Sequence, residues 1–118
     1  MVLVDTSVWV KHLRDGEPVL EDLLKGGHVV CHLFIVGELA CGNLKNRTEI
    51  LGLLQTLPMA VLAEDGEVLR FIENNRLMGR GLGLIDMHLL ASALLSGLQL
   101  WTLDKRLQQA ALKLGVAF

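Results

Sequence analysis

Short apolar runs alternate with helical patterns along this chain, and this alternation limits the folds that it can adopt. Such an order is typical of an α/β fold with a parallel sheet that helices cover on both faces. The strands are expected at residues 2–4, 28–31, 59–62, 99–103 and 116–118. The helices are expected at 8–14, 18–24, 33–44, 48–57, 64–78, 85–96 and 105–114. We therefore predict a three-layer α/β/α architecture around a central parallel sheet of about five short strands.

The composition favours one globular domain spanning residues 1–118. The chain is 52% hydrophobic with a mean hydropathy of +0.46, which is enough for one buried core and argues against disorder. Its most apolar stretch, 87–101, is interrupted by polar residues and falls short of the ~18 apolar residues that a membrane span needs. No basic segment precedes the first apolar run, so we expect no signal peptide. Cys31 and Cys41 are expected to be free buried thiols, as suits a cytoplasmic protein.

Four acidic residues stand beside or inside apolar runs, where packing alone does not explain them. Asp5 and Asp104 each follow a predicted strand, and ligands of open α/β sheets bind beyond the carboxyl ends of the strands. Each of these two could instead simply cap the helix that follows it. Asp86 and Glu38 lie on helices, and neither has a basic residue three or four positions away. An ionised carboxylate in apolar surroundings is costly unless it is paired or binds a metal.

A shared site for these carboxylates would suit a hard cation. Oxygen ligands select Mg²⁺ or Mn²⁺ over zinc, and no C-x-x-C or H-x-x-x-H spacing supports a zinc site. The histidines lack acidic or cysteine partners at ligand spacing, and the tryptophans lie in apolar runs. We interpret all of these residues as structural: His12, His28, His32, His88, Trp9 and Trp101.

Four segments carry a resemblance that covers nearly the whole chain. They are Val-Asp-Thr-Ser-Val-Trp at 4–9, Gly-Glu-Leu-Ala-Cys-Gly at 37–42, Gly-Leu-Gly-Leu-Ile-Asp-Met-His-Leu-Leu-Ala-Ser-Ala at 81–93, and Leu-Trp-Thr-Leu-Asp-Lys-Arg-Leu at 100–107. In this order and spacing, they resemble the PIN-domain family, and specifically the VapC-type toxin ribonucleases of toxin–antitoxin pairs. Each segment alone is a weak signal, whereas the four together are specific.

The resemblance implies a function and a set of site residues. The acidic metal site of the family would correspond to Asp5, Glu38, Asp86 and Asp104, with supporting hydroxyls from Thr6, Ser7 and Thr102. The resemblance implies Mg²⁺-dependent cleavage of single-stranded RNA, a homodimer, and neutralisation by a VapB-type antitoxin. We expect Asp5 and Asp86 to be the principal metal ligands. Glu38 and Asp104 would bind a second ion, bind through water or orient the attacking water.

The net charge of −2 does not exclude an RNA substrate. If the four singled-out acids neutralise metal, the remaining charged residues are 11 basic against 9 acidic. Arg76 and Arg80 flank a glycine-bearing loop before Asp86, and arginine suits bidentate phosphate contact. Lys105 and Arg106 follow Asp104. Each of these basic side chains could contact RNA or merely face water.

Three other functions compete with the nuclease hypothesis. A phosphate-accepting receiver domain shares the layout but needs a doubled acid after the first strand, where Asp5 stands alone. A haloacid-type phosphatase needs a second Asp at position 7, which is Ser7 here. A PIN-like module that binds RNA or protein without cleaving is the remaining alternative.

Overall fold

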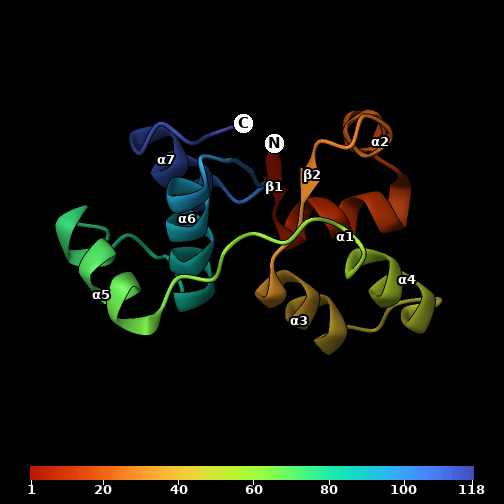
Figure 1. Ribbon diagram of the computed structural model, residues 1–118, viewed down its shortest axis with the longest axis horizontal. Coiled ribbons are helices and arrows are strands. Elements are labelled where there is room, and N and C mark those ends of the chain that lie inside the picture. The colour runs from red at the N-terminus through yellow and green to blue at the C-terminus, as the bar shows by residue number, and fades with distance from the viewer.

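The computed structural model describes residues 1–118 and confirms an α/β fold (Figure 1). In chain order the elements are β1 (Val2–Val4), α1 (Thr6–Asp15), α2 (Pro18–Lys25), β2 (Val29–Val30), α3 (Leu33–Cys41), α4 (Arg47–Leu54), α5 (Asp65–Asn74), α6 (Leu84–Ser96), β3 (Gln99–Trp101) and α7 (Lys105–Lys113). The molecule is elongated, with extents of 40 × 25 × 23 Å. Figure 1 shows α5, α6 and α7 on one side of the strands and α1 to α4 on the other.

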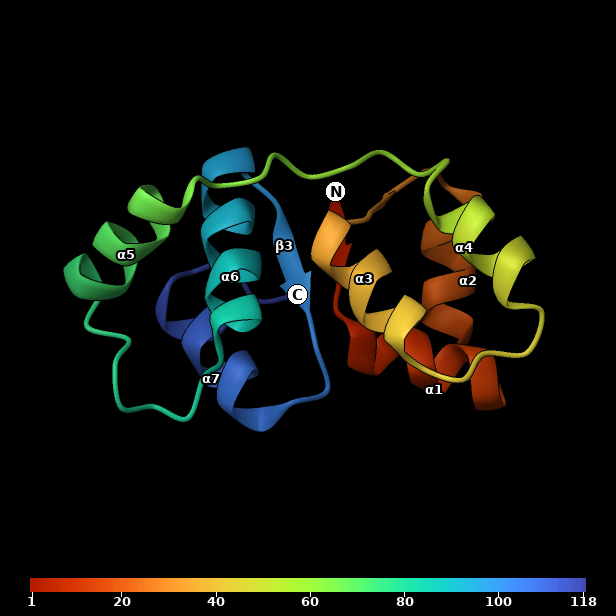
Figure 2. The same ribbon diagram turned by 90° about the horizontal axis from the view of Figure 1, so that it is seen from below.

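The central sheet is parallel but has three strands, so the prediction of about five is wrong. The strand order is β2-β1-β3, with Val4 of β1 opposite Trp101 of β3. The two other segments expected to be strands are reduced to single bridges, Cys31 with Met59 and Leu100 with Ala117. β2 has only two residues, so it offers the segment beside it little to pair with. The segment between α4 and α5, which contains Met59, then crosses to α5, as Figure 2 shows.

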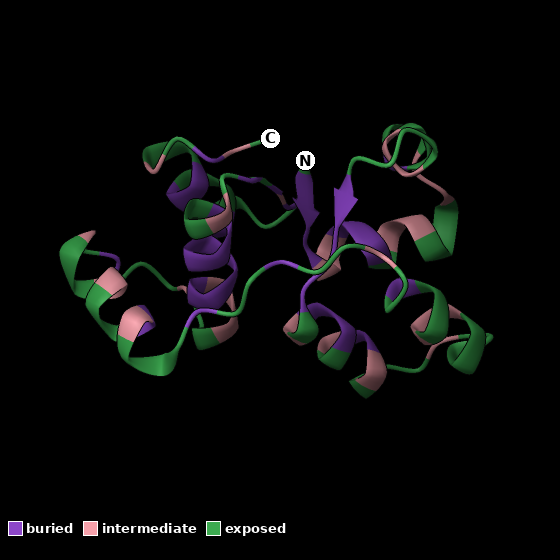
Figure 3. Ribbon diagram, viewed as in Figure 1, coloured by how far each residue is buried: buried purple, intermediate pink, exposed green.

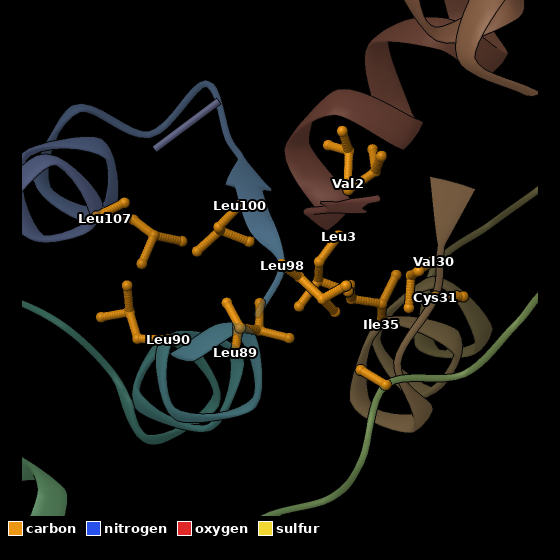
Figure 4. Close-up of a cluster of buried hydrophobic side chains, with 14 of the residues drawn as sticks. Val2, Leu3, Val30, Cys31, Ile35, Leu89, Leu90, Leu98, Leu100 and Leu107 are labelled. Atoms are coloured by element: carbon orange, nitrogen blue, oxygen red, sulfur yellow. The ribbon is translucent and has the colours of Figure 1, made fainter. Parts of the chain in front are cut away.

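The hydrophobic core lies where α6 packs against the sheet. The buried run Met87–Ala93 confirms that this helix is surrounded on most sides, as its nearly uniform apolar sequence predicted. Figure 3 shows the burial concentrated in the strands and α6. In the close-up of Figure 4, Leu89 and Leu100 lie between α6 and β3, and Leu3 lies near Ile35 of α3; all four are at most 1% exposed. This packing fixes α6, which carries Asp86, against the strands that Asp5 and Asp104 follow.

Helix ends differ from the predicted ones where local geometry stops the helix. The helix predicted over 64–78 ends at Asn74, because Arg76 adopts a left-handed conformation (φ 52°) and Leu77 N–H bonds back to the Ile72 carbonyl. This is a Schellman motif, in which glycine usually occupies the left-handed position. The helix predicted over 33–44 ends at Cys41, because Gly42 is extended.

His32 joins α3 to α6 at the centre of the molecule. It caps α3 by accepting the Phe34 N–H at Nδ1 (3.0 Å), and its Nε2 lies 3.1 Å from Ser92 Oγ. Burial, and then the neighbouring His88, lower the pKa of His32 to about 4. The ring is therefore neutral near pH 7, with Nε2–H donating to Ser92. The structural interpretation of this histidine is confirmed.

The remaining expectations on thiols and tryptophans are met in part. Cys31 is buried, and its burial raises the pKa of the thiol. Cys41 is exposed at the end of α3, so the expectation that it is buried is wrong. Trp9 is buried, whereas Trp101 is half-buried against Phe118. None of the helices is both long enough and apolar enough to cross a membrane.

Candidate functional site

The carboxyl ends of β1 and β3 bring two of the four acids together. The strands are adjacent and parallel, and the Asp5 N–H donates to the Trp101 carbonyl at 2.9 Å. Asp5 follows β1 directly, and Thr102 follows β3. The residues after both strands therefore lie side by side at one edge of the sheet, as the sequence predicted for Asp5 and Asp104.

Asp5 is oriented by two hydroxyl groups instead of capping a helix. Its Oδ2 accepts hydrogen bonds from Ser7 Oγ and from Thr102 Oγ1, each at 2.7 Å. Its side chain makes no cap bond to α1, although Asp5 occupies the N-cap position. Asp5 is only 7% exposed, and its Oδ1 has no hydrogen-bond partner. A buried carboxylate with one fixed and one free oxygen is suited to bind a cation.

The two hydroxyls are themselves fixed by the backbone after β3. Ser7 Oγ accepts the Leu103 N–H at 3.0 Å, and Thr102 Oγ1 accepts the Asp104 N–H at 3.1 Å. Each hydroxyl thus accepts from the main chain and donates its single hydrogen to Asp5. Ser7 and Thr102 therefore hold the first acid in place, and their support of a metal site stays a prediction.

Asp104 caps the last helix, as one of its two sequence interpretations predicted. Its Oδ1 accepts the Leu107 N–H at 3.0 Å, and its Oδ2 has no partner. The side chain is exposed. Capping and metal binding are compatible here, because the cap uses only one of the two carboxylate oxygens.

Asp86 lies in the first turn of α6, close enough to two other acids to be affected by their charge. Its Oδ2 accepts the Gly83 N–H at 3.0 Å. Burial raises the pKa of the Asp86 carboxyl, the Gly83 hydrogen bond opposes that effect, and the charges of Asp5 and Asp104 raise the pKa further. These three carboxylates therefore repel one another, and the repulsion would be relieved by a cation between them.

Glu38 joins the site through Thr6. The Thr6 hydroxyl donates to Glu38 Oε1 at 2.8 Å, across 32 positions in the sequence. Thr6 is the residue after Asp5, so α3 presents its acid next to the start of α1. Glu38 is half-buried, and its other carboxylate oxygen has no partner.

The site has negative charge without an ion pair. None of the four acids forms a salt bridge; the ion pairs are Lys11–Glu17 and Arg14–Asp15, and His88 Nε2 lies 3.8 Å from Asp65 Oδ1. The structure also has no group of three or more Asp, Glu, His or Cys side chains converging tightly enough to enclose a metal ion. The donors are all oxygens, and each acid keeps a free one, which fits Mg²⁺ or Mn²⁺. Such ions retain several waters and so need no closed protein cage.

The basic residues singled out in the sequence lie in the two segments that carry Asp86 and Asp104, and all four are exposed. Arg76 and Arg80 are exposed in the loop before α6, and Arg80 Nε donates to the Arg76 carbonyl at 3.1 Å. Lys105 and Arg106 are exposed on the first turn of α7. Arg106 lies against the backbone of Gly81 in the loop before α6. The sequence did not predict this contact between the loop and α7.

The sequence comparisons agree with this arrangement. A model of the PIN domain family matches residues 2–113. The chain is similar to Ribonuclease VapC32 of Mycobacterium tuberculosis (strain CDC 1551 / Oshkosh), with 47% identity over 118 residues that cover 99% of this chain and 95% of that protein. Ribonuclease VapC32 of Mycobacterium tuberculosis (strain ATCC 25618 / H37Rv) gives the same identity and coverage. The match extends through all four acidic segments, and the chain belongs to the PIN domain family.

Proposed function

We propose that this chain is a VapC-type toxin endoribonuclease that hydrolyses RNA with Mg²⁺ or Mn²⁺. The observation that carries this proposal is the buried Asp5 carboxylate, oriented by Ser7 and Thr102 and electrostatically coupled to Asp86. The names of the similar mycobacterial proteins support the activity and the toxin role. The proposal includes a single PIN domain over residues 1–118, with helical layers on both faces of the sheet.

The four acids would have different roles in binding the metal ion and the attacking water. Asp5 and Asp86 would be the principal ligands. Asp5 is held in one orientation by hydrogen bonds, and the charge of Asp86, which burial and the nearby Asp5 and Asp104 disfavour, would be stabilised by a bound cation. Glu38 and Asp104 would bind a second ion, bind through water or orient the attacking water. A divalent cation would supply an activated water and charge stabilisation on the phosphate. The hydroxyls of Thr6, Ser7 and Thr102 keep two of these carboxylates, Glu38 and Asp5, fixed before the substrate arrives.

RNA would approach from the side that carries the basic residues. Arg76 and Arg80 are exposed in the loop before the helix that carries Asp86, and Lys105 is exposed directly after Asp104. Phosphate contacts of this kind orient a backbone without reading its sequence. They would place a phosphodiester beside the ion.

Protein partners would use the apolar surface that the fold leaves open. An apolar groove of about 330 Å³ lies between α1 and α4, and seven of its nine lining residues are hydrophobic. An apolar segment of a partner protein would fit this groove. We infer a VapB-type antitoxin as the partner and a homodimer as the assembly, in the cytoplasm.

The proposal is tested by RNA cleavage with purified protein. The wild type should cleave RNA with Mg²⁺ or Mn²⁺ and stop in EDTA. Asp5→Asn and Asp86→Asn should each lower kcat by on the order of 100-fold or more, because each removes charge from the ion site. Asp22→Asn is the matched control, since Asp22 is an exposed aspartate on α2. Metal-independent cleavage, or equal activity of all three variants, would contradict the proposed site.

A non-catalytic binding module is the second candidate. It rests on the exposed basic residues Arg76, Arg80 and Lys105, which would hold RNA whether or not the RNA is cleaved. A binding module would retain RNA in a gel-shift assay with Mg²⁺ present and leave it intact. The nuclease would convert the same RNA to fragments.

A further inference from the structure

Gly81 lies directly beneath the side chain of Arg106. Its φ is 75°, a left-handed conformation, and a Cβ at this position would lie 2.6 Å from Arg106 Nη1 and 2.9 Å from Arg106 Cδ. Two parts of the arginine side chain therefore lie against the bare backbone of the loop. Any larger residue would need a strained backbone and would displace the arginine.

This contact joins the two segments that carry Asp86 and Asp104. Two residues after Gly81, Gly83 donates its N–H to Asp86 Oδ2. Arg106 comes two residues after Asp104 in the first turn of α7. Arg106 forms no ion pair with any carboxylate, so the glycine contact, and not a salt bridge, accounts for its position.

The loop before α6 has few other restraints. The backbone N–H groups of residues 78–82 make no hydrogen bond within the chain. Within this stretch only Leu82 packs partly against the core. The Arg106 side chain is thus one of few restraints on this loop, beside the partly packed Leu82 and the hydrogen bond from Arg80 to the Arg76 carbonyl, and the last residue of the loop orients Asp86.

We propose that Arg106 is a positioning residue for Asp86. By lying on Gly81 it holds the loop before α6 against α7, and so preserves the hydrogen bond between Gly83 and Asp86. The Asp86 carboxylate then keeps its direction toward the ion. This role rests on the proposed metal-dependent function and differs from a direct contact of Arg106 with RNA.

The test measures metal binding without RNA. Mn²⁺ is titrated calorimetrically into protein stripped with EDTA. Arg106→Ala should weaken Mn²⁺ binding by about tenfold, as is usual when a group that orients a ligand is lost. Arg106→Lys should restore part of this affinity, because it keeps most of the aliphatic stem. Arg70→Ala is the control, since Arg70 is also exposed and lies 3.5 Å from a Cβ built at Gly66 on α5.

A double-mutant comparison isolates the contact itself. Gly81→Ala should strain the loop in either background, so the extra loss of Mn²⁺ affinity that it causes in the wild type, compared with its effect in Arg106→Ala, measures the displacement of the arginine. In cleavage assays, Arg106→Ala should lower kcat at limiting Mn²⁺ and leave the KM for RNA nearly unchanged. Excess Mn²⁺ should recover the lost rate.

Other outcomes would overturn the proposal. An unchanged Mn²⁺ affinity with a higher, salt-dependent KM for RNA would make Arg106 a phosphate contact instead. No change in either quantity would make its contact with Gly81 incidental. If the wild type neither binds Mn²⁺ nor cleaves RNA, the proposed function itself fails, and the wild-type control alone reveals this.

Discussion

Acidification should destabilise the protein through His32 before it protonates most carboxylates. The ring is fully buried and its pKa is lowered to about 4, first by burial and then by His88. In the unfolded chain its pKa is about 6.5. At pH values between these two pKa values, the unfolded state therefore binds a proton at His32 and the folded state does not. The stability due to neutral His32 is present above pH 6.5 and is lost as the pH falls toward 4.

The magnitude follows from these two pKa values. Each pH unit within the window costs about 1.4 kcal/mol, so the whole interval corresponds to about 3 kcal/mol. Between pH 7 and pH 5 the loss should be about 2 kcal/mol. A loss of this size is a large share of the stability of a small domain.

Urea unfolding at pH 7, 6 and 5 measures this effect. His32→Asn is the informative variant, because its amide oxygen can still accept the Phe34 N–H as an N-cap without titrating. The variant should be less stable at pH 7, since it loses the bond to Ser92, but its stability should vary less with pH. His28→Asn is the control, because His28 is exposed. Equal pH dependence in the wild type and His32→Asn would refute the reasoning.

Three further predictions concern the site and its approach. Thr102→Val should lower the free energy of unfolding in urea by about 1–3 kcal/mol, because the Asp104 N–H loses its acceptor, and should also lower metal-dependent cleavage because Asp5 loses a donor. Asp86→Asn should raise the melting temperature in EDTA at pH 7, because the pKa of Asp86 is raised and its ionised form is unfavourable; the gain should shrink as the acid becomes protonated at low pH. Arg76→Gly should raise the urea midpoint, by up to about 1 kcal/mol in stability, because glycine adopts the left-handed conformation more easily.

The sequence predicted the type of each helix and strand better than its extent. The apolar pattern of α6 identified a buried helix because burial acts along its whole length. Strand number was overestimated because an apolar run such as 59–62 does not reveal how many neighbours it can pair with. The two-residue length of β2 limits that pairing, and this is a property of the assembled sheet. The end of α5 was not predicted, because Arg76 occupies the left-handed position where a glycine would have marked the end of the helix.

The candidate acids were visible in the sequence, but their orientation was not. Asp5 and Asp104 had the same two interpretations, cap or ligand, and the structure separates them. Asp104 caps its helix, whereas Asp5 is held by Thr102, 97 positions away in the sequence. Likewise the partner of Glu38 is Thr6, on another helix. Local patterns cannot supply such partners, because they exist only when the strands pair.

The hydrogen bonds of the acids hold them in place without placing a positive charge beside them. Neutral hydroxyls orient Asp5 and Glu38, and a backbone N–H orients Asp86. None of these donors carries a full charge, so none competes with a cation as a lysine or arginine would. A salt bridge would lower the repulsion among Asp5, Asp86 and Asp104 but would also occupy the oxygens that an ion needs. The unrelieved repulsion is therefore the physical reason to expect strong binding of a divalent ion at this edge of the sheet.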